Sequence, residues 1–325
     1  MKKDIGILLI FVVLCAILAL LNPRFLCATN LQNTSRLIGM FGIFSIGVGF
    51  VIITGGIDLS SGSLFSFLGV LLCLGLVDYQ LPWPLVVAAV LGLGGLLGLF
   101  HGLVVTRLGL QPFIVTLCGM LWYRGLASFL ANDSTKGFGN CQGFEPLAAF
   151  ATGNLLGIPI PFVLLCVIGA IAWVVLHRSV YGRYLMAVGQ NEEAARFSGV
   201  NTKRIVTSAY VISGGLGAVS AIFFAFYANA VQPSSHGNFY EVFGIAAAVL
   251  GGCSLRGGEG SIVGIVIGAA LLQVLKNLVN LLGIRSSLDF AVMGTVIFIG
   301  VITDELLKRR KLNREVRDTA AANAV

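Results

Sequence analysis

Residues 37–77 read LIGMFGIFSIGVGFVII-TGGIDLS-SGSLFSFLGVLLCLGLV, two long apolar runs separated by a short glycine-rich interruption. A helix of about 20 apolar residues crosses the roughly 30 Å hydrocarbon core of a bilayer. The two runs therefore predict a pair of membrane spans, the first ending near Ile53 and the second near Val77. Irregular backbone at membrane depth survives only where protein buries it or a water-filled cavity receives it, so the interruption 54–60 is a candidate functional helix break.

The rest of the chain repeats this apolar pattern. Of its 325 residues 57% are hydrophobic and only 11% are charged, whereas soluble domains carry about 25% charged residues. We expect an all-α, polytopic transmembrane bundle of about ten spans, some broken or re-entrant, with a transmembrane domain over 1–307 and a basic tail over 308–325. The other eight expected spans cover about residues 5–21, 85–106, 112–130, 158–177, 205–228, 242–250, 261–282 and 290–303. The polar stretch 132–157 is expected to form the longest loop.

Basic residues set the orientation. With the N-terminus inside and ten spans, most of the 21 Lys and Arg fall in cytoplasmic segments, as the positive-inside rule requires. These fifteen are Lys2, Lys3, Arg107, Arg178, Arg183, Arg196, Lys203, Arg204, Arg256, Lys308, Arg309, Arg310, Lys311, Arg314 and Arg317, against four outside (Arg24, Arg36, Lys136 and Arg285). Both termini are therefore expected in the cytoplasm. The net charge of +7 is a topology signal and predicts no nucleic-acid partner.

Two glycine-rich breaks and two polar residues inside spans are candidate pathway positions. In the first break, the Asp58 carboxylate either caps the helix that follows or contacts the transported solute, and both alternatives stay open. Arg124 needs backbone carbonyls or a wet cavity, because a lone membrane Arg costs about 2.5–3.5 kcal/mol on insertion scales. His101 is expected to serve packing, and no residue spacing predicts a metal site. The candidates are Gly55, Gly56, Asp58, Ser60, His101, Arg124, Gly251, Gly252 and Ser254.

The charged segment 178–204 contains a different signal, NEEAARFSGV at residues 191–200. Asn191 suits an N-cap, acidic residues follow in the first turn, and Gly199 suits the end of a helix. The segment thus predicts a cytoplasmic helix of about two turns that docks into a partner. Its residues are Asn191, Glu192, Glu193, Ala194, Ala195, Arg196, Ser198 and Gly199.

Over nearly its whole length the chain resembles the ribose/galactose/xylose-type permeases of bacterial ABC importers. The resemblance is carried by ITGGIDLS (53–60), PFIVTL (112–117), RGLA (124–127), GRY (182–184), NEEAARFSGV (191–200), AVLGGCSL (248–255), Gly260-Ser261 and NLLG (280–283). It departs from the family at His101, where Asn is usual, and at Cys253, where Thr is usual. These departures leave the particular sugar open.

The resemblance implies a multi-pass protein of the bacterial inner membrane that moves a neutral monosaccharide inward. It implies as partners a second permease copy or a paralogue, two ATP-binding cassette ATPases and an extracytoplasmic sugar-binding protein. It also implies that residues 191–200 are the coupling helix that receives the ATPase stroke.

The residues themselves limit the energy source. The chain has no GxxxxGK[ST] phosphate-binding run, so we expect no bound cofactor, with ATP-Mg on the partner ATPase. The spans also lack the series of acidic and histidine residues expected of a proton-driven carrier. An ion-driven secondary sugar transporter is thus the disfavoured alternative, and a passive channel or scaffold would not explain the capped helix. No nucleophile–base or metal constellation suggests an enzyme.

Overall fold

The computed structural model describes residues 2–139, 142–283, 288, 290–295 and 298. Residues 1–274 form one compact unit and residues 275–325 a second. The expected basic tail at 308–325 and half of the last expected span, 290–303, lie outside the described residues. The domain limits at 307/308 therefore remain a prediction.

Helices dominate the described residues. The apolar ones are α1 (Lys2–Leu21), α2 (Ala28–Ile53), α3 (Ser61–Cys73), α4 (Trp83–Leu108), α5 (Pro112–Leu130), α7 (Ile160–His177), α10 (Thr202–Ala228), α11 (Tyr240–Leu250) and α12 (Ile262–Leu281). The short ones are a 3₁₀ turn η1 (Pro23–Leu26), a π-helical turn η2 (Leu74–Asp78), α6 (Glu145–Thr152), α8 (Val180–Gln190) and α9 (Glu192–Phe197). Two-residue strands pair antiparallel, β1 (Lys136–Gly137) with β4 (Ala230–Val231) and β2 (Asn154–Leu155) with β3 (Ile158–Pro159).

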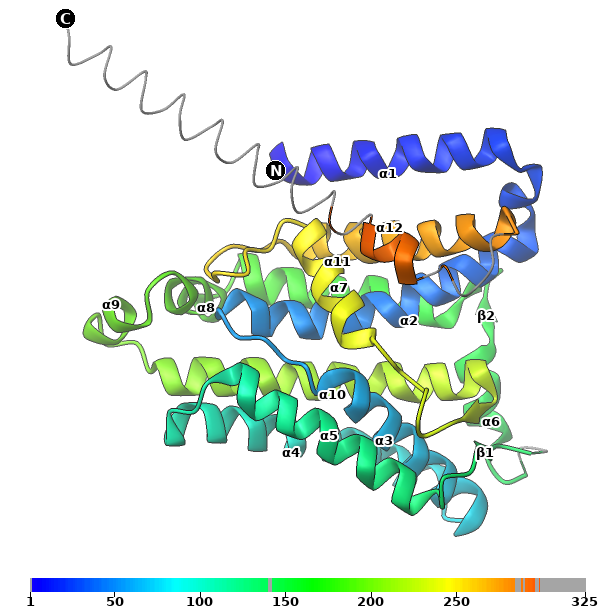
Figure 1. Ribbon diagram of the computed structural model, residues 1–325, viewed down its shortest axis with the longest axis horizontal. Helices are drawn as coiled ribbons and strands as arrows, with labels where there is room; N and C mark the ends of the chain where they lie inside the picture. Colours follow the sequence, from blue (N-terminus) through cyan, green and yellow to red (C-terminus); the bar gives the residue numbers. More distant parts are fainter. Residues whose placement is uncertain (1, 140–141, 284–287, 289, 296–297, 299–325) are drawn as a thin grey trace, which may run out of the picture. The chain divides into compact units, whose positions relative to one another are not determined.

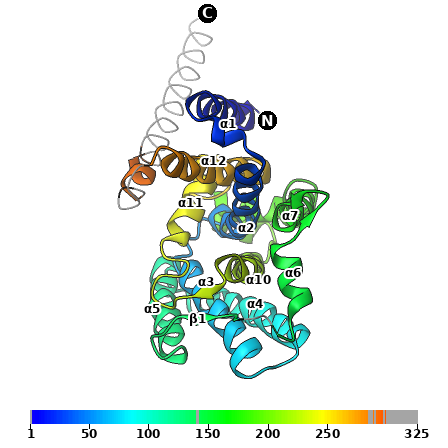
Figure 2. The ribbon, with the colours of Figure 1, turned by 90° about the vertical axis from the view of Figure 1, so that its right-hand side faces the viewer.

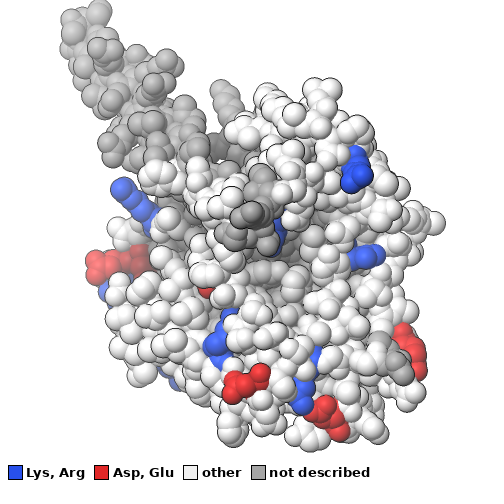
Figure 3. Space-filling view, turned by 45° about the vertical axis from the view of Figure 1, so that its right-hand side comes forward, with Lys and Arg blue, Asp and Glu red and all other residues white. Residues whose placement is uncertain are grey.

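Seven described helical segments are long and apolar enough to cross a bilayer, and α1 and α11 are shorter apolar helices. The expected all-α polytopic architecture is thus confirmed, whereas the number of spans stays a prediction. Charged side chains are few and scattered on the face shown in Figure 3. In Figure 1, α8 and α9 lie at the opposite end of the helices from α6, β1 and β2, as expected for segments on opposite sides of a membrane.

Three segments differ from the sequence prediction. The expected loop 132–157 contains helix α6, which starts with an acidic residue in its first turn and a proline at its N-terminal end, both favourable there. The charged segment 178–204 contains α8 in addition to α9, because the Ser179 hydroxyl caps its start by accepting from the Gly182 N–H at 3.2 Å. Helix α2 begins at Ala28, well before the expected start at Leu37, and its polar first turns bond to the segment 152–157.

Helix α10 occupies the centre of the first unit. It packs against α2, α3, α4, α6 and α8, and Figure 2 shows it end-on among α2, α3, α4 and α6. The apolar stretch of α2 is 89% buried, against 22% in α4, so α2 is a core helix and α4 exposes most of its surface. Burial of an apolar helix on all sides is typical of the inside of a membrane bundle.

Glycines allow α4 and α10 to approach closely. Gly94, Gly98 and Gly102 are spaced four residues apart on one side of α4 and face α10. A Cβ built on Gly94 would lie 2.7 Å from the carbonyl oxygen of Gly214, so only glycine fits there. Such small-xxx-small contacts replace the hydrophobic effect as the basis of helix association in lipid.

Candidate functional site

The break between α2 and α3 is centred on the buried Asp58, which is 4% exposed. Its Oδ1 accepts from the Ser60 backbone N–H at 2.9 Å and from the Ser60 hydroxyl at 2.6 Å. Its Oδ2 accepts from the Ser213 hydroxyl of α10 at 3.3 Å. A carboxylate with three donors is well satisfied in a buried site, where an unpaired one would be costly. Asp58 thus bonds to Ser60, the N-cap residue of α3, and not to a backbone N–H within that helix, so both alternatives for Asp58 stay predictions.

His101 of α4 extends this network across the bundle. It is 2% exposed, with Nδ1 3.4 Å from the Ser60 hydroxyl and Nε2 3.4 Å from the Tyr123 hydroxyl of α5. With the proton on Nδ1, every group in the series Tyr123, His101, Ser60 and Asp58 donates to the next. We call Asp58, Ser60, His101, Tyr123 and Ser213 the central polar cluster. It joins the start of α3 to α4, α5 and α10.

The central polar cluster is enclosed by glycine. A Cβ built on Gly119 of α5 would collide with the His101 ring, and one on Gly56 would lie 3.0 Å from the Tyr210 hydroxyl. The Tyr210 hydroxyl is buried and has no hydrogen-bond partner among the described residues. The hydrogen bonds of the central polar cluster and the close contacts at Gly56 and Gly119 thus hold the break in one conformation.

The second glycine-rich break, 251–260, lies directly against the first. The Gly258 N–H donates to the Ile53 carbonyl at the end of α2, at 2.8 Å. A Cβ built on Gly257 would lie 2.7 Å from both the Gly55 nitrogen and the Gly189 carbonyl oxygen. A Cβ on Gly189, at the end of α8, would collide with the Ile53 carbonyl oxygen. We call these five residues the glycine junction.

The remaining residues predicted in this loop shape its turn. Ser254 accepts from the Gly257 N–H through its carbonyl at 2.9 Å and donates its own N–H to Glu259 at 3.1 Å. Gly252 has φ +90°, which L side chains rarely adopt. A Cβ on Gly251 would lie 2.5 Å from the backbone of Gly264 in α12. These positions therefore serve the backbone path of the loop.

Helix α9 forms as the sequence predicts. The Asn191 side chain accepts from the Ala194 N–H at 2.9 Å, and Gly199 ends the helix with φ +84°. Its side chains are exposed except that of Ala195. Because α8 ends at Gln190, the residue before the cap, α9 follows directly from the glycine junction. Its role as the coupling helix stays a prediction.

Arg124 lies apart from the central polar cluster. Its guanidinium donates to the carbonyls of Pro233 and His236, each at 2.8 Å, in the loop between β4 and α11. Bonding to carbonyls was one of the two roles the sequence left open. Burial, with the nearby Arg124 charge as a lesser cause, lowers the pKa of His236 to about 4, so this imidazole is neutral at physiological pH.

Replacing Arg124 with leucine is expected to release the loop 232–239. The change removes two charge-assisted hydrogen bonds: the His236 carbonyl loses its guanidinium donor, and the Pro233 carbonyl keeps only the Ser66 hydroxyl at 3.0 Å. Amide hydrogen exchange at His236 should rise by about tenfold or more, since such bonds contribute about 1.5–3 kcal/mol each. Arg124→Lys, which keeps a charge and one donor, should show a smaller rise. Unchanged exchange in Arg124→Leu would contradict the anchoring role.

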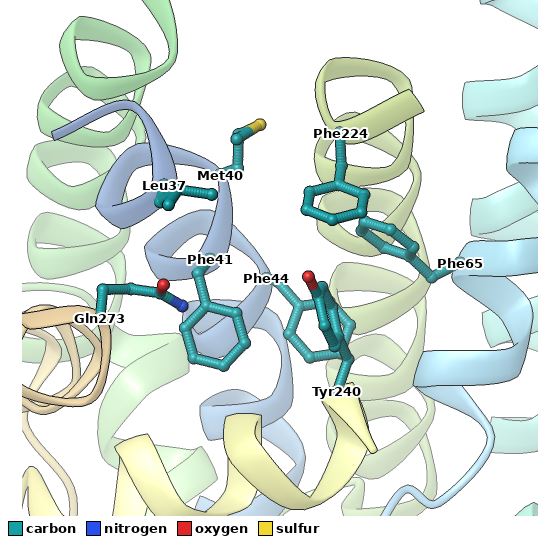
Figure 4. Close-up of a pocket in the computed structure, with 8 residues that line it drawn as sticks. All are labelled: Leu37, Met40, Phe41, Phe44, Phe65, Phe224, Tyr240 and Gln273. Atoms are coloured by element: carbon teal, nitrogen blue, oxygen red, sulfur yellow. The ribbon is translucent and has the colours of Figure 1, made fainter. Parts of the chain in front are cut away.

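An aromatic pocket lies between α2, α3, α10, α11 and α12 (Figure 4). The Tyr240 ring is its hub, with centroids 5.4 Å from Phe65, 5.4 Å from Phe224 and 5.7 Å from Phe41. Gln273 contributes the only side-chain amide, which points toward the Phe41 ring in Figure 4. The lining residues are Leu37, Met40, Phe41, Phe44, Phe65, Phe224, Tyr240 and Gln273. The free space of about 10 Å³ is about that of one water molecule, so the pocket as it stands has no room for a larger ligand.

Two buried polar atoms beside the pocket have no hydrogen-bond partner among the described residues, Nε2 of His236 and Oε2 of Glu241. The His236 ring stacks on Phe65, at 5.5 Å between centroids, and meets Phe224 edge-on at 5.1 Å. The Glu241 carboxylate lies against the first turn of α3, where a Cβ on Gly62 would collide with it. Unsatisfied buried polar atoms are rare, and each calls for an explanation.

Known proteins are similar to this chain in sequence over most of its length. The family described as "Branched-chain amino acid transport system / permease component" matches residues 30–301. The ribose import permease protein of Escherichia coli (strain K12) is 37% identical over 297 residues, covering 91% of this chain and 92% of the relative. The chain belongs to this permease family. The corresponding protein of Bacillus subtilis (strain 168) is 38% identical over 305 residues, covering 93% of this permease and 92% of the relative.

The chain is also similar to permease proteins that are not named for ribose. The autoinducer 2 import system permease protein of Enterobacter sp. (strain 638) is 31% identical over 307 residues, covering 94% of the permease and 93% of the relative. No solved structure matches the permease. The resemblance that the sequence motifs predict is therefore confirmed at the level of the family.

Several residues of the permease site were not predicted. Tyr123 and Ser213 join the central polar cluster, and Tyr240, Glu241 and Gln273 lie in or beside the aromatic pocket. A signal was available for two of them: Tyr123 precedes Arg124 in an apolar run, and Ser213 precedes two glycines that predict close packing. The pocket aromatics carry no such signal, because they are a few of 22 phenylalanines and 7 tyrosines in the chain.

Proposed function

We propose that this permease is the membrane subunit of an ABC importer that moves a neutral monosaccharide inward. Its relatives include ribose and fructose import permeases, which supports a sugar as cargo. The observation that carries the proposal is the aromatic pocket. The C–H faces of a sugar ring pack on aromatic rings, and its hydroxyls need a small number of placed polar groups, which Gln273 and the Tyr240 hydroxyl supply.

The two unpartnered atoms beside the pocket fit the same proposal. When the helices separate and the pocket opens, the Glu241 carboxylate and the neutral His236 ring become acceptors for sugar hydroxyls. In the present arrangement they have no hydrogen-bond partner among the residues that the structure describes. The pathway would thus bind sugar only in passing, and affinity would reside in a separate binding protein.

The proposed partners follow from the family. We propose a second permease copy or a paralogue, two ATPase subunits that hold ATP-Mg, and an extracytoplasmic sugar-binding protein. We further propose that the chain lies in the bacterial inner membrane with about ten spans and both termini in the cytoplasm. The end-to-end separation of α9 from α6 supports this orientation.

Coupling is proposed to run through the glycine junction. The ATPases would dock on α9, and α9 is continuous with α8, whose Gly189 lies against the Ile53 carbonyl. A displacement of α8 would therefore press directly on the backbone of both helix breaks, because Gly189 lies against Ile53 and Gly258. Close packing without voids transmits such displacements. Each break in turn leads directly into the helix that follows it, α3 or α12.

Uptake of labelled sugar into proteoliposomes tests the proposal. The permease is reconstituted with and without its ATPase and its binding protein, and with ATP inside or absent. Uptake should require both partners and ATP, and the best substrate among ribose, xylose, galactose and fructose names the cargo. Uptake by the permease alone, driven by an ion gradient, would replace the importer with a secondary carrier.

Gln273→Leu tests the pocket itself. The change keeps the size of the side chain and removes the amide, so sugar hydroxyls lose a hydrogen-bonding partner worth about 0.5–1.5 kcal/mol. Uptake should fall by about three- to tenfold, whereas ATPase stimulation by the binding protein should remain. Gln273→Asn, which keeps the amide, is the control and should retain more uptake. Equal uptake in Gln273→Leu and in the unaltered protein would remove the pocket from the pathway.

A further inference from the structure

A groove of about 510 Å³ runs between the end of α4 and the start of α10, away from the aromatic pocket. Its volume is within the roughly 300–1,000 Å³ of small-molecule sites. The family assignment and the proposed transport path give this groove no role. Its two ends differ in chemistry: basic side chains line one end, and aliphatic side chains line the other.

Three cations gather at the helix ends. Arg107 comes from the last turn of α4, and Lys203 and Arg204 come from the first turn of α10. All three side chains are exposed, and no carboxylate among the described residues pairs with them. The described residues that line the groove include no acidic side chain. The N-terminal end of α10 adds the positive end of a long helix dipole, so this end of the groove attracts an anion.

The aliphatic end lies further along the same helices. Leu103 and Leu99 are one and two turns before Arg107 on α4, and Val211 is about two turns after Arg204 on α10. At 1.5 Å per residue, two turns place the aliphatic end roughly 11 Å from the cations. A free phosphate or nucleotide has no hydrocarbon chain to pack on the aliphatic end, whereas a molecule with an anionic head and a hydrocarbon tail would contact both ends.

We propose that this groove binds one anionic phospholipid. The headgroup phosphate would accept hydrogen bonds from Arg107, Lys203 and Arg204, and an acyl chain would lie along Leu99, Leu103 and Val211. The positive-inside rule places these cations at the cytoplasmic surface, where anionic lipids attract basic residues near the ends of membrane helices. Because α10 starts just after α9, a lipid bound here would brace the base of that helix.

The test is lipid retention by the purified permease, measured by native mass spectrometry in neutral detergent. Phosphatidylglycerol and phosphatidylcholine of the same acyl composition are titrated in parallel. The groove variant Arg107→Gln/Lys203→Gln/Arg204→Gln is compared with Arg178→Gln/Arg183→Gln/Arg196→Gln, which loses the same charge from exposed arginines outside the groove. A photoactivatable phosphatidylglycerol, cross-linked to the unaltered protein and mapped by peptide, gives a readout that needs no variant.

The unaltered permease should retain phosphatidylglycerol over phosphatidylcholine, with cross-links on α4 and α10. Each basic residue contributes about fivefold to anionic-lipid affinity, so the groove variant should bind roughly 100-fold more weakly and the control variant nearly normally. Equal retention of both lipids, or an equal loss in both variants, would overturn the proposal. So would a groove variant that keeps its lipid but no longer assembles with the ATPase, because the groove would then be a protein interface.

Discussion

Exchange of Glu192 and Glu193 for lysine is expected to abolish ATP-driven uptake while the permease still inserts and folds. Both side chains lie in the first turn of α9, are exposed, and present negative charge to whatever docks there. Their reversal turns an acidic docking face into a basic one, and like-charge juxtaposition at an interface costs several kcal/mol. Uptake in the reconstituted importer should fall by at least about tenfold, and ATPase stimulation by the binding protein should be lost with it.

The helix itself should survive the exchange. Loss of an acidic residue near a helix N-terminus costs about 0.3–1 kcal/mol, whereas the Asn191 cap, which bonds to the Ala194 N–H, remains in place. A loss of uptake therefore reports on docking more than on local unfolding. Circular dichroism and size-exclusion profiles of the variant should match those of the unaltered protein.

A matched charge reversal at the other end of the helices is the control. Glu145 also lies in the first turn of a short helix, α6, and Glu145→Lys makes the same chemical change far from α9. We expect this variant to transport sugar when the binding protein is supplied in excess. Normal uptake in the Glu192/Glu193 variant would show that α9 is not the coupling helix.

The sequence predicted the helices well because apolar runs of membrane length are a strong signal. The capped helix α9 was also predicted nearly to the residue, since an N-cap, acidic first turn and closing glycine are all local features. Helix α8 was not predicted, although its buried residues Gly182, Leu185 and Val188 recur at helical spacing. The glycines and arginine of this short segment weaken its apolar signal, and the Ser179 hydroxyl caps its start by accepting from the Gly182 N–H.

The relations between distant segments were harder to predict. Gly55, Gly189 and Gly258 were each visible as glycines, but nothing local in the sequence shows that they meet in one junction. The same holds for His101, whose partners Ser60 and Tyr123 come from two other helices. The sequence identified the polar residues that must be satisfied, whereas the choice of partner is fixed by the packing of helices around α10.

The largest loss of stability is expected for changes in the central polar cluster. In Asp58→Leu the Ser60 N–H, the Ser60 hydroxyl and the Ser213 hydroxyl all lose their acceptor in a buried site. Each orphaned buried donor costs about 1–3 kcal/mol, so the variant should lose about 3 kcal/mol or more of folding free energy. For a protein of this size the apparent melting temperature in detergent should fall by about 6–12 °C.

Asp58→Asn separates the contribution of the hydrogen bonds from that of the carboxylate charge. It has the same size and keeps one carbonyl oxygen, which still accepts from the Ser60 N–H, while its amide donates to the Ser213 hydroxyl. Its melting temperature should therefore stay within a few degrees of the unaltered protein, and Asp58→Leu should lie well below both. If Asp58→Asn and Asp58→Leu fell equally, the carboxylate charge and not its acceptors would hold the break. If neither fell, α3 would be positioned by the glycine contacts alone, and Asp58 would be free to contact the sugar.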